Sequence, residues 1–247
     1  MSGWLRIIGL GPGAASLRTP EAEAALAEAT DILGYGPYVA RVAARTEQRV
    51  HPTDNREELD RARHALELAE TGARVAVVSS GDPGVFAMAA AVFEAVEHGP
   101  APWRDLDIQV LPGISAMFAA AARLGAPLGH DFCAISLSDN LKPWELVEKR
   151  LRLAAEAGFV LALYNPISRA RPWQLGRAFA LLREHLPGTV PVAFATAISR
   201  PEERMVLRPL AEANPALADM RTLVLVGSAA TRMAGRFLYT PRSAASA

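Results

Sequence analysis

The stretch Val75-Ala-Val-Val-Ser-Ser-Gly-Asp-Pro-Gly-Val-Phe86 joins an apolar run to a glycine turn. The run is short and β-branched, which predicts a buried strand. Gly81-Asp-Pro-Gly84 ends the strand, because glycine permits unusual φ values and proline fixes its own. Residues 88–96 are Ala-rich and predict a helix. Open α/β sheets bind ligands at such turns, so we expect a ligand site here, with an ordinary strand–turn–helix connection as the alternative. Asp82 puts a negative charge at the edge of this expected site, which suits a cation or a ribose better than a phosphate.

Strands and helices alternate on both sides of this stretch. Further strands are expected at 4–10, 107–111, 132–137, 159–163, 190–195 and 222–226. The alternation predicts an α/β fold. Gly125-Ala-Pro-Leu-Gly129 is the expected hinge. We therefore expect an N-terminal α/β domain at 1–125, a C-terminal α/β domain at 126–242 and a disordered tail at 243–247.

Small or polar turns follow most of the expected strands. In the first half they are Gly9–Gly13, Gly81–Gly84 and Gly113–Ala116. Parallel strands bring such turns to one edge, where small residues leave room for a flat ligand. The second half adds Ser138-Asp139, Tyr164-Asn165, Ala195-Thr196 and Gly227-Ser228. Two such edges predict a ligand cleft between the domains.

Gly9-Leu-Gly-Pro-Gly13 is similar to a dinucleotide-binding fingerprint. Its third glycine comes one place early, however, and the next helix begins only near Thr19-Pro20, with Thr19 as its N-cap. The acid that should end the second strand is also missing, since Asp31 precedes Ile32-Leu33. An NAD-dependent oxidoreductase is therefore a disfavoured alternative.

Composition excludes several other classes of protein. The 247 residues carry a formal net charge of zero and are 51% apolar, which is typical of a soluble globular protein without a nucleic-acid footprint. The apolar N-terminus is too short for a signal peptide or a membrane span, so we expect a cytoplasmic protein. A lone cysteine, Cys133, excludes an internal disulfide and a multi-cysteine zinc site, and no Glu/Asp/His spacing indicates another metal.

Side chains that could carry chemistry are few. His51 and His130 could act as acid–base groups near neutral pH, although most lone histidines are structural or solvated. Several arginines could clamp carboxylates or simply be solvated: Arg45, Arg49, Arg123, Arg169, Arg171 and Arg232.

Three motifs in this order resemble the tetrapyrrole (corrin/porphyrin) methyltransferase family. They are Gly9-Leu-Gly-Pro-Gly13, Ser80-Gly-Asp-Pro-Gly84 and Pro112-Gly-Ile-Ser-Ala116. The resemblance extends from Leu5 to about Tyr239. Within the family, the precorrin-3B C17-methyltransferases are similar at further segments, with less typical stretches at Gly227-Ser228 and Ala195-Thr-Ala197. The similar segments are Gly34-Tyr35 with Tyr38, Gly125-Ala-Pro-Leu-Gly-His-Asp-Phe132, Ile135-Ser-Leu-Ser-Asp139 and Leu163-Tyr-Asn-Pro166.

This resemblance implies a fold and an activity. The fold is that of class III S-adenosylmethionine methyltransferases, with two α/β domains and the cofactor between them. The activity is methylation of C17 of a hydroxylated tetrapyrrole lactone with extrusion of C20, a ring contraction in cobalamin biosynthesis. A homodimer is also implied. The alternatives are methylation of another ring carbon and a non-catalytic tetrapyrrole-binding protein.

The resemblance also implies site residues. A base for the C20 hydroxyl would help the contraction, and the candidates are Asp82, Asp139 and His51. Carboxylates of the substrate would meet Lys142, Asn165, Arg169 and Arg232. S-adenosylmethionine would be bordered by Pro12, Gly81, Asp82, Val85, Ser115, Ala116, Tyr164, Thr196, Ala197 and Ser228.

Overall fold

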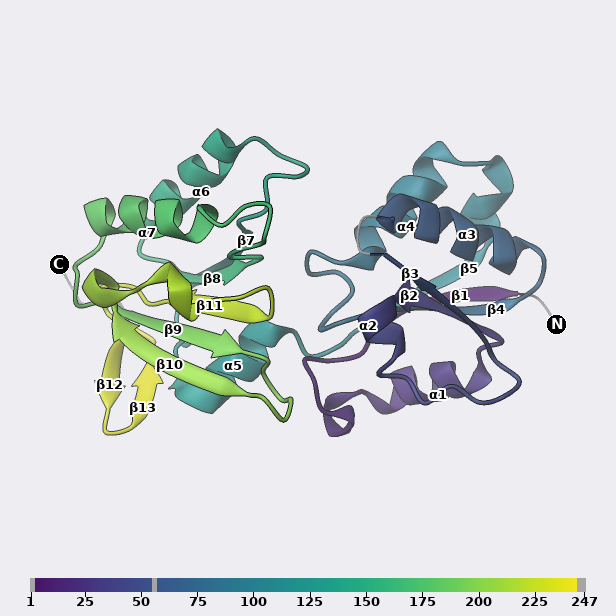
Figure 1. Ribbon diagram of the computed structural model, residues 1–247, viewed down its shortest axis with the longest axis horizontal. Coiled ribbons are helices and arrows are strands. Elements are labelled where there is room, and N and C mark those ends of the chain that lie inside the picture. Colours follow the sequence, from purple (N-terminus) through teal and green to yellow (C-terminus); the bar gives the residue numbers. More distant parts are fainter. Residues whose placement is uncertain (1–2, 55–56, 244–247) are drawn as a thin grey trace. The chain divides into compact units, whose positions relative to one another are not determined.

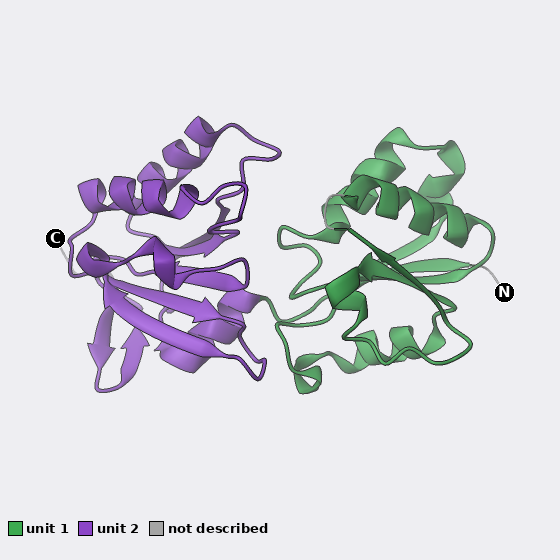
Figure 2. Ribbon diagram, in the orientation of Figure 1, with its two compact units in different colours: residues 1–115 green, residues 116–247 purple. Residues whose placement is uncertain are grey.

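The computed structural model describes residues 3–54 and 57–243 and divides into two compact units. They comprise residues 1–115 and 116–247 (Figure 2). The division falls at Ser115–Ala116, before the hinge expected at Gly125. The reason is that helix α5 (Ala116–Leu124) packs on the second sheet, where Ala120 joins Ala162 and Leu225 in one buried cluster. The tail expected to be disordered falls, apart from Ser243, outside the described residues.

The first unit holds a five-stranded parallel sheet in the order β3-β2-β4-β1-β5. Its two central apolar strands, β1 and β4, are the strands that the sequence predicts most clearly, and both are confirmed. Strand β3, which contains Val50, forms one edge of the sheet. The strands are β1 (Trp4–Gly9), β2 (Asp31–Tyr35), β3 (Arg49–Thr53), β4 (Arg74–Ser79) and β5 (Asp107–Leu111).

Helices cover both faces of this sheet (Figure 1). Successive residues of β1 alternate, so that Ile7 joins one buried cluster and Ile8 the other. Thr19 caps α1 as expected, since its hydroxyl accepts the N–H of Ala22. One face carries α1 (Pro20–Glu28) and α2 (Gly36–Val39), and the other carries α3 (Glu58–Glu70) and α4 (Met88–His98); short 3-10 helices are η1 (Ala15–Leu17) and η2 (Ala101–Asp105).

The second unit holds a mixed sheet in the order β10-β9-β11-β8-β7. Strands β7 and β8 are parallel, whereas β11 runs antiparallel to both β8 and β9. The α/β class is thus confirmed in both units. The strands are β7 (Phe132–Ser136), β8 (Val160–Tyr164), β9 (Pro191–Thr196), β10 (Arg204–Pro209) and β11 (Thr222–Val226).

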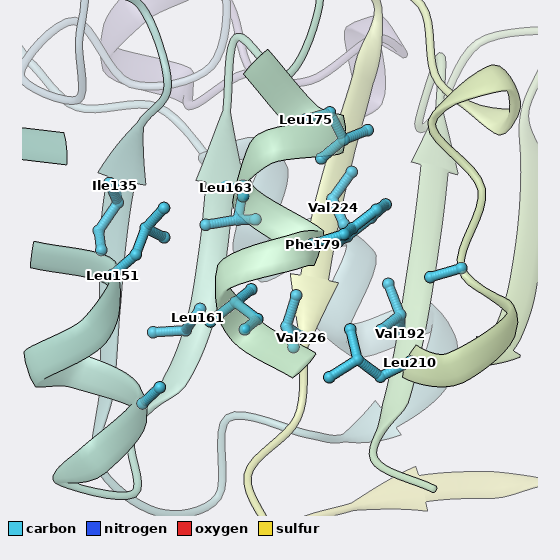
Figure 3. Close-up of a cluster of buried hydrophobic side chains, with 14 of the residues drawn as sticks. Ile135, Leu151, Leu161, Leu163, Leu175, Phe179, Val192, Leu210, Val224 and Val226 are labelled. Carbon is cyan, nitrogen blue, oxygen red and sulfur yellow. The ribbon is translucent and has the colours of Figure 1, made fainter. Parts of the chain in front are cut away.

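One face of this second sheet is covered by α6 (Trp144–Glu156) and α7 (Gln174–His185). Figure 3 shows the core between these two helices and the sheet. Leu151 of α6 and Phe179 of α7 belong to the same buried cluster as Leu163 and Val224 of the strands. Alternating apolar residues on the strands and an apolar stripe on each helix account for this packing. The 3-10 helices η3 (Leu210–Glu212) and η4 (Pro215–Leu217) precede β11.

A third, small sheet joins β12 (Arg232–Ala234), β13 (Phe237–Tyr239) and β6 (Gly125–Ala126). The expected hinge at Gly125 is therefore a strand. Gly125 has a φ of +131°, and a Cβ there would lie 2.7 Å from the carbonyl oxygen of Leu238. Glycine is needed at this position because β13 passes so close.

Candidate functional site

Two of the predicted glycine turns are joined at the carboxyl ends of the first unit's central strands. Gly11 follows β1 and Gly81 follows β4, and the two residues exchange backbone hydrogen bonds of 3.2 and 2.9 Å. Both have left-handed backbone, with φ of +66° and +65°. The predicted meeting of these turns at one edge is therefore confirmed, because β1 and β4 are adjacent parallel strands.

The glycines serve a purpose different from the one expected. A Cβ at Gly9 would lie 2.6 Å from the backbone nitrogen of Gly113, and a Cβ at Gly113 would collide with the carbonyl oxygen of Gly81. The turns after β1, β4 and β5 thus pack backbone against backbone. The absent side chains let the three turns approach one another, rather than leave room for a flat ligand.

Asp82 ties two of these turns together. Its Oδ1 accepts the N–H of Gly84 at 2.8 Å, and its Oδ2 accepts the N–H of Gly113 at 3.1 Å. Both carboxylate oxygens therefore accept hydrogen bonds from the backbone. This arrangement suits a residue that shapes the turns better than one that removes a proton.

The other predicted cofactor contacts of the first unit lie on the same turns. Pro12 is buried beside Gly11, and Ser115 is 2% exposed after the β5 turn. The N–H of Val85 donates to the carbonyl of Asp82 at 3.2 Å. Phe86 follows with a φ of +53°, which is rare for a bulky residue and is typical of functional sites.

Arg41 is a residue of this edge that the sequence analysis missed. Its Nη2 donates to the carbonyl oxygens of Leu10 and Gly11, both at 2.9 Å, and its Nη1 donates to Ser80 Oγ at 3.1 Å. A single arginine after a short helix carries no sequence signal that would have indicated this contact.

In the second unit, the carboxyl ends of β7, β8 and β9 lie at one edge of the sheet. Strands β8 and β9 share a direction because both run antiparallel to β11. This edge brings together Tyr164, Thr196 and Ala197 with the loop that holds Asp139. Tyr164 Oη accepts the N–H of Met117 at 3.2 Å, next to Ala116 at the start of α5.

Thr196 and Ala197 are buried at this edge. The hydroxyls of Thr196 and Thr222 share a hydrogen bond of 2.9 Å. Ala197 has a φ of +51°. Non-glycine residues with left-handed backbone are uncommon, and they concentrate where function constrains the chain.

Ser228 lies at the opposite edge of this sheet. Val226 pairs with Val192, and the N–H of Gly227 donates to the carbonyl of Pro191, at the start of β9. The family resemblance implied Ser228 as a cofactor contact together with Thr196, whereas the antiparallel β11 places the two residues at opposite edges of this sheet. Ser228 is instead buried, with its N–H bonded to Thr231 Oγ1.

Arg232 is also apart from the other predicted substrate residues. It lies exposed on β12 of the small third sheet. Its Nε donates to Tyr239 Oη at 3.0 Å, and its guanidinium lies over the Tyr239 ring.

The loop after β7 holds Asp139 in a polar network. Asp139 Oδ1 accepts from Arg171 Nη1 at 2.7 Å and from Gln174 Nε2 at 2.9 Å. Asn165, with a φ of +51°, donates from Nδ2 to Ser136 Oγ at 2.9 Å. These bonds join the ends of β7 and β8.

Two cationic side chains flank this network. Lys142 is partly buried, and burial lowers its pKa from 10.5; the positive charge of Arg150 adds to the shift, while Asp139 opposes it. Arg169 is exposed on the loop after β8. Both residues lie on loops that follow the carboxyl ends of β7 and β8.

His51 belongs to a separate cluster. Its Nε2 lies 2.9 Å from Oδ1 of Asp31, a fully buried carboxylate that also accepts from Arg49 Nη2 at 2.7 Å. Asp31 starts β2, so it lies at the amino end of the sheet, whereas the glycine turns lie at the carboxyl end. The structure therefore does not bring His51 together with Asp82.

The β1 turn is unsuited to a pyrophosphate. The carbonyls of Leu10, Gly11 and Gly13 converge on the Arg41 guanidinium, and α1 starts only at Pro20. A dinucleotide site needs converging N–H groups and a helix N-terminus at this point. The β1 turn therefore lacks the features of a dinucleotide site.

The described residues contain no group of three or more His, Cys, Asp or Glu side chains placed to hold a metal ion. Within the same ranges, no helix is both long and apolar enough to span a membrane.

Comparison with known proteins agrees with the motifs. Residues 5–214 match the model of the Tetrapyrrole (Corrin/Porphyrin) Methylases. The chain is 58% identical to the precorrin-3B C(17)-methyltransferase of Sinorhizobium sp, covering 98% of this chain and 97% of that one.

Solved structures show the same fold. The crystal structure of the methyltransferase CobJ has a TM-score of 0.94 and 59% identity, covering 97% of this chain and 100% of that one. The uroporphyrin-III C-methyltransferase of Thermus thermophilus, complexed with S-adenosyl homocysteine, has a TM-score of 0.66 and 25% identity over 91% of this chain and 92% of that one. The resemblance drawn from the motifs is thereby confirmed, and the chain belongs to the tetrapyrrole (corrin/porphyrin) methylase family.

Proposed function

We propose that this protein transfers a methyl group from S-adenosylmethionine to C17 of precorrin-3B, with ring contraction to precorrin-4, in cobalamin biosynthesis. The observation that carries the proposal is the 58% identity, over nearly both full lengths, to a precorrin-3B C(17)-methyltransferase. The interlocked turns after β1, β4 and β5 support it, because they carry the three family motifs and lack the features of a dinucleotide site.

The candidate cofactor contacts are residues that the family resemblance implies. S-adenosylmethionine, when bound, supplies a methyl group already activated by the sulfonium charge. In the first unit the candidate contacts are Pro12, Gly81, Asp82, Val85 and Ser115, and in the second they are Ala116, Tyr164, Thr196 and Ala197. Ser228, which the resemblance also implies, follows β11 at the other edge of its sheet. Since the donor is already activated, the protein's main task is to orient the reactants.

The substrate would be held at the loops after β7 and β8. Its carboxylates suit the cationic Lys142 and Arg169, and Asn165 adds an amide at the same edge. Arg232 lies on the third sheet and is a weaker candidate.

Among the candidate bases, Asp139 is the best placed. Both of its hydrogen bonds use Oδ1, so they leave Oδ2 to accept a proton. Asp82 uses both oxygens on backbone N–H groups, and His51 is paired with Asp31. We therefore propose that Asp139 is the base that accepts the proton of the C20 hydroxyl.

We further propose that the enzyme acts in the cytoplasm and as a homodimer, the latter as its family resemblance implies. Light scattering of the purified protein measures the mass directly. Twice the 26.4 kDa chain mass supports the dimer, and the single chain mass contradicts it.

Two assays test the proposal. Calorimetric titration with S-adenosylhomocysteine, with NAD as the control titrant, should show micromolar binding of the first alone. Incubation with precorrin-3B and S-adenosylmethionine should then consume both. Binding without turnover would favour a non-catalytic tetrapyrrole-binding protein. No binding by folded protein would contradict the methyltransferase.

A further inference from the structure

We infer that Arg41 is a positioning residue for the methyl donor: its guanidinium holds the β1 and β4 turns in the shape that the cofactor contacts. The inference rests on the proposed function, because it takes these turns to be in contact with the cofactor. Arg41 follows α2 and belongs to neither turn.

The guanidinium spans the two turns. Nη2 donates to the carbonyl oxygens of Leu10 and Gly11 at 2.9 Å and of Gly13 at 3.3 Å. Nη1 donates to Ser80 Oγ at 3.1 Å, at the end of β4. One planar group thus contacts both turns.

Three carbonyl oxygens that converge on one point repel each other unless a cation lies there. Arg41 supplies that cation. The carbonyl of Leu10 also shares a peptide plane with the N–H of Gly11, which donates to Gly81. By holding that carbonyl, Arg41 sets the direction of the N–H that joins the turns.

Arg41 is itself held in place. Its backbone N–H donates to the carbonyl of Tyr38 at 3.0 Å, and its carbonyl accepts from Arg18 Nη2 at 3.1 Å. Arg18 in turn pairs with Glu23 at 2.8 Å. The arginine is therefore part of a fixed scaffold and differs from a solvated surface side chain.

Loss of the Arg41 guanidinium should weaken cofactor binding more than it lowers the stability of the fold. The candidate contacts Pro12, Gly81 and Asp82 lie on the two turns that Arg41 joins. The buried cluster on the opposite face of the sheet, which holds Leu5 and Val77, includes no residue of the Arg41 segment. Loss of the guanidinium should relax the turns while the sheet remains.

Arg41→Ala and Arg41→Lys test the inference, with Arg104→Ala as the matched control. Arg104 is an exposed arginine of the same unit that donates to the carbonyl of Glu97. Affinity for S-adenosylhomocysteine is measured by calorimetry, and thermal unfolding is measured alongside. Methylguanidinium is then added to the Arg41→Ala protein.

We expect Arg41→Ala to bind S-adenosylhomocysteine about 10- to 100-fold more weakly, the loss of hydrogen bonds to a charged donor. The KM for S-adenosylmethionine should rise while the KM for the tetrapyrrole stays constant. Arg41→Lys should be intermediate, because an ammonium keeps the charge but not the planar fork. Methylguanidinium should restore binding to the alanine variant, and Arg104→Ala should match the wild type.

Wild-type affinity in Arg41→Ala, or in a folded Arg41→Lys should the alanine variant not fold, would overturn the inference and leave the proposed function standing. A loss that methylguanidinium does not reverse, in step with lower stability, would make Arg41 merely structural. A wild-type protein that does not bind S-adenosylhomocysteine would overturn both.

Discussion

At the scale of single residues, hydrogen bonds separate carboxylates that look alike in the sequence. Asp82, Asp139 and Asp31 are all acidic groups near strand ends. Both oxygens of Asp82 accept backbone N–H groups. One oxygen of Asp139 accepts hydrogen bonds from Arg171 and Gln174. Asp31 is buried and bonded to Arg49 and His51. The sequence names Asp82 and Asp139 as candidate bases, and only the hydrogen bonds of the folded protein distinguish the roles of these carboxylates.

Asp82→Asn tests the structural role of this carboxylate. An amide can accept one of the two backbone N–H groups but presents a donor to the other, so the turns should loosen. Affinity for S-adenosylhomocysteine should fall about tenfold, the cost of leaving one N–H unbonded. The shape of the pH–rate profile should not change. Loss of a kinetic pKa in Asp82→Asn would instead make Asp82 the base.

Asp31 makes stability depend on pH. Burial raises its pKa, but hydrogen bonds from Arg49, His51 and Thr30 outweigh burial and lower the pKa below its usual 3.8. A lowered folded-state pKa stabilises the fold above 3.8, and this contribution is lost as the pH falls through the folded value.

Asp31→Asn should therefore lower the free energy of unfolding at pH 7 by about 1–3 kcal/mol. It should also flatten the loss of stability below pH 4. Urea titrations at a series of pH values measure both effects. An unchanged acid slope in the variant would show that Asp31 does not contribute to it.

At the scale of elements, apolar strands and their turns could be predicted, but strand direction could not. The runs that became β1, β4, β8 and β11 are each apolar, whichever direction the strand takes. The separation of Ser228 from Thr196 follows from strand direction. The third sheet was missed because strands of two or three residues leave no periodic pattern.

Gly113→Ala tests the packing of the turns. Its Cβ would collide with the Gly81 carbonyl and lie 2.9 Å from the Gly9 Cα. We expect a loss of about 1–3 kcal/mol in unfolding free energy, typical of overpacking, together with weaker binding of S-adenosylhomocysteine. Gly36→Ala is the control, since its Cβ would come no closer than 4.0 Å to Pro52. Equal effects in the two variants would contradict close packing of the turns.

Lys142→Gln tests the loop after β7 as the substrate side. The variant should raise the KM for the tetrapyrrole about tenfold, as expected for a lost charged hydrogen bond, and leave affinity for S-adenosylhomocysteine unchanged. Because burial lowers the Lys142 pKa, wild-type substrate affinity should decline with rising pH before an ordinary lysine deprotonates, and the variant should lack this decline. An unchanged KM would remove Lys142 from the substrate site.

At the scale of the whole molecule, the three motifs identified the family, while the close packing of their turns was visible only in the fold. Each glycine turn alone is a common feature. Their order along the chain predicts the family, and the full-length similarity to a precorrin-3B C(17)-methyltransferase agrees. Arg41, which braces two of the turns, could be found only once the chain had brought it to them.

The most direct test of the account is to locate the transferred methyl group. The protein is incubated with precorrin-3B and S-adenosylmethionine carrying a ¹³C-labelled methyl group, and the product is examined by NMR and mass spectrometry. The proposed C17 methylation predicts one added label, bonded to C17, in a macrocycle from which C20 has been extruded. A label on another ring carbon, or bound cofactor without a labelled product, would contradict it.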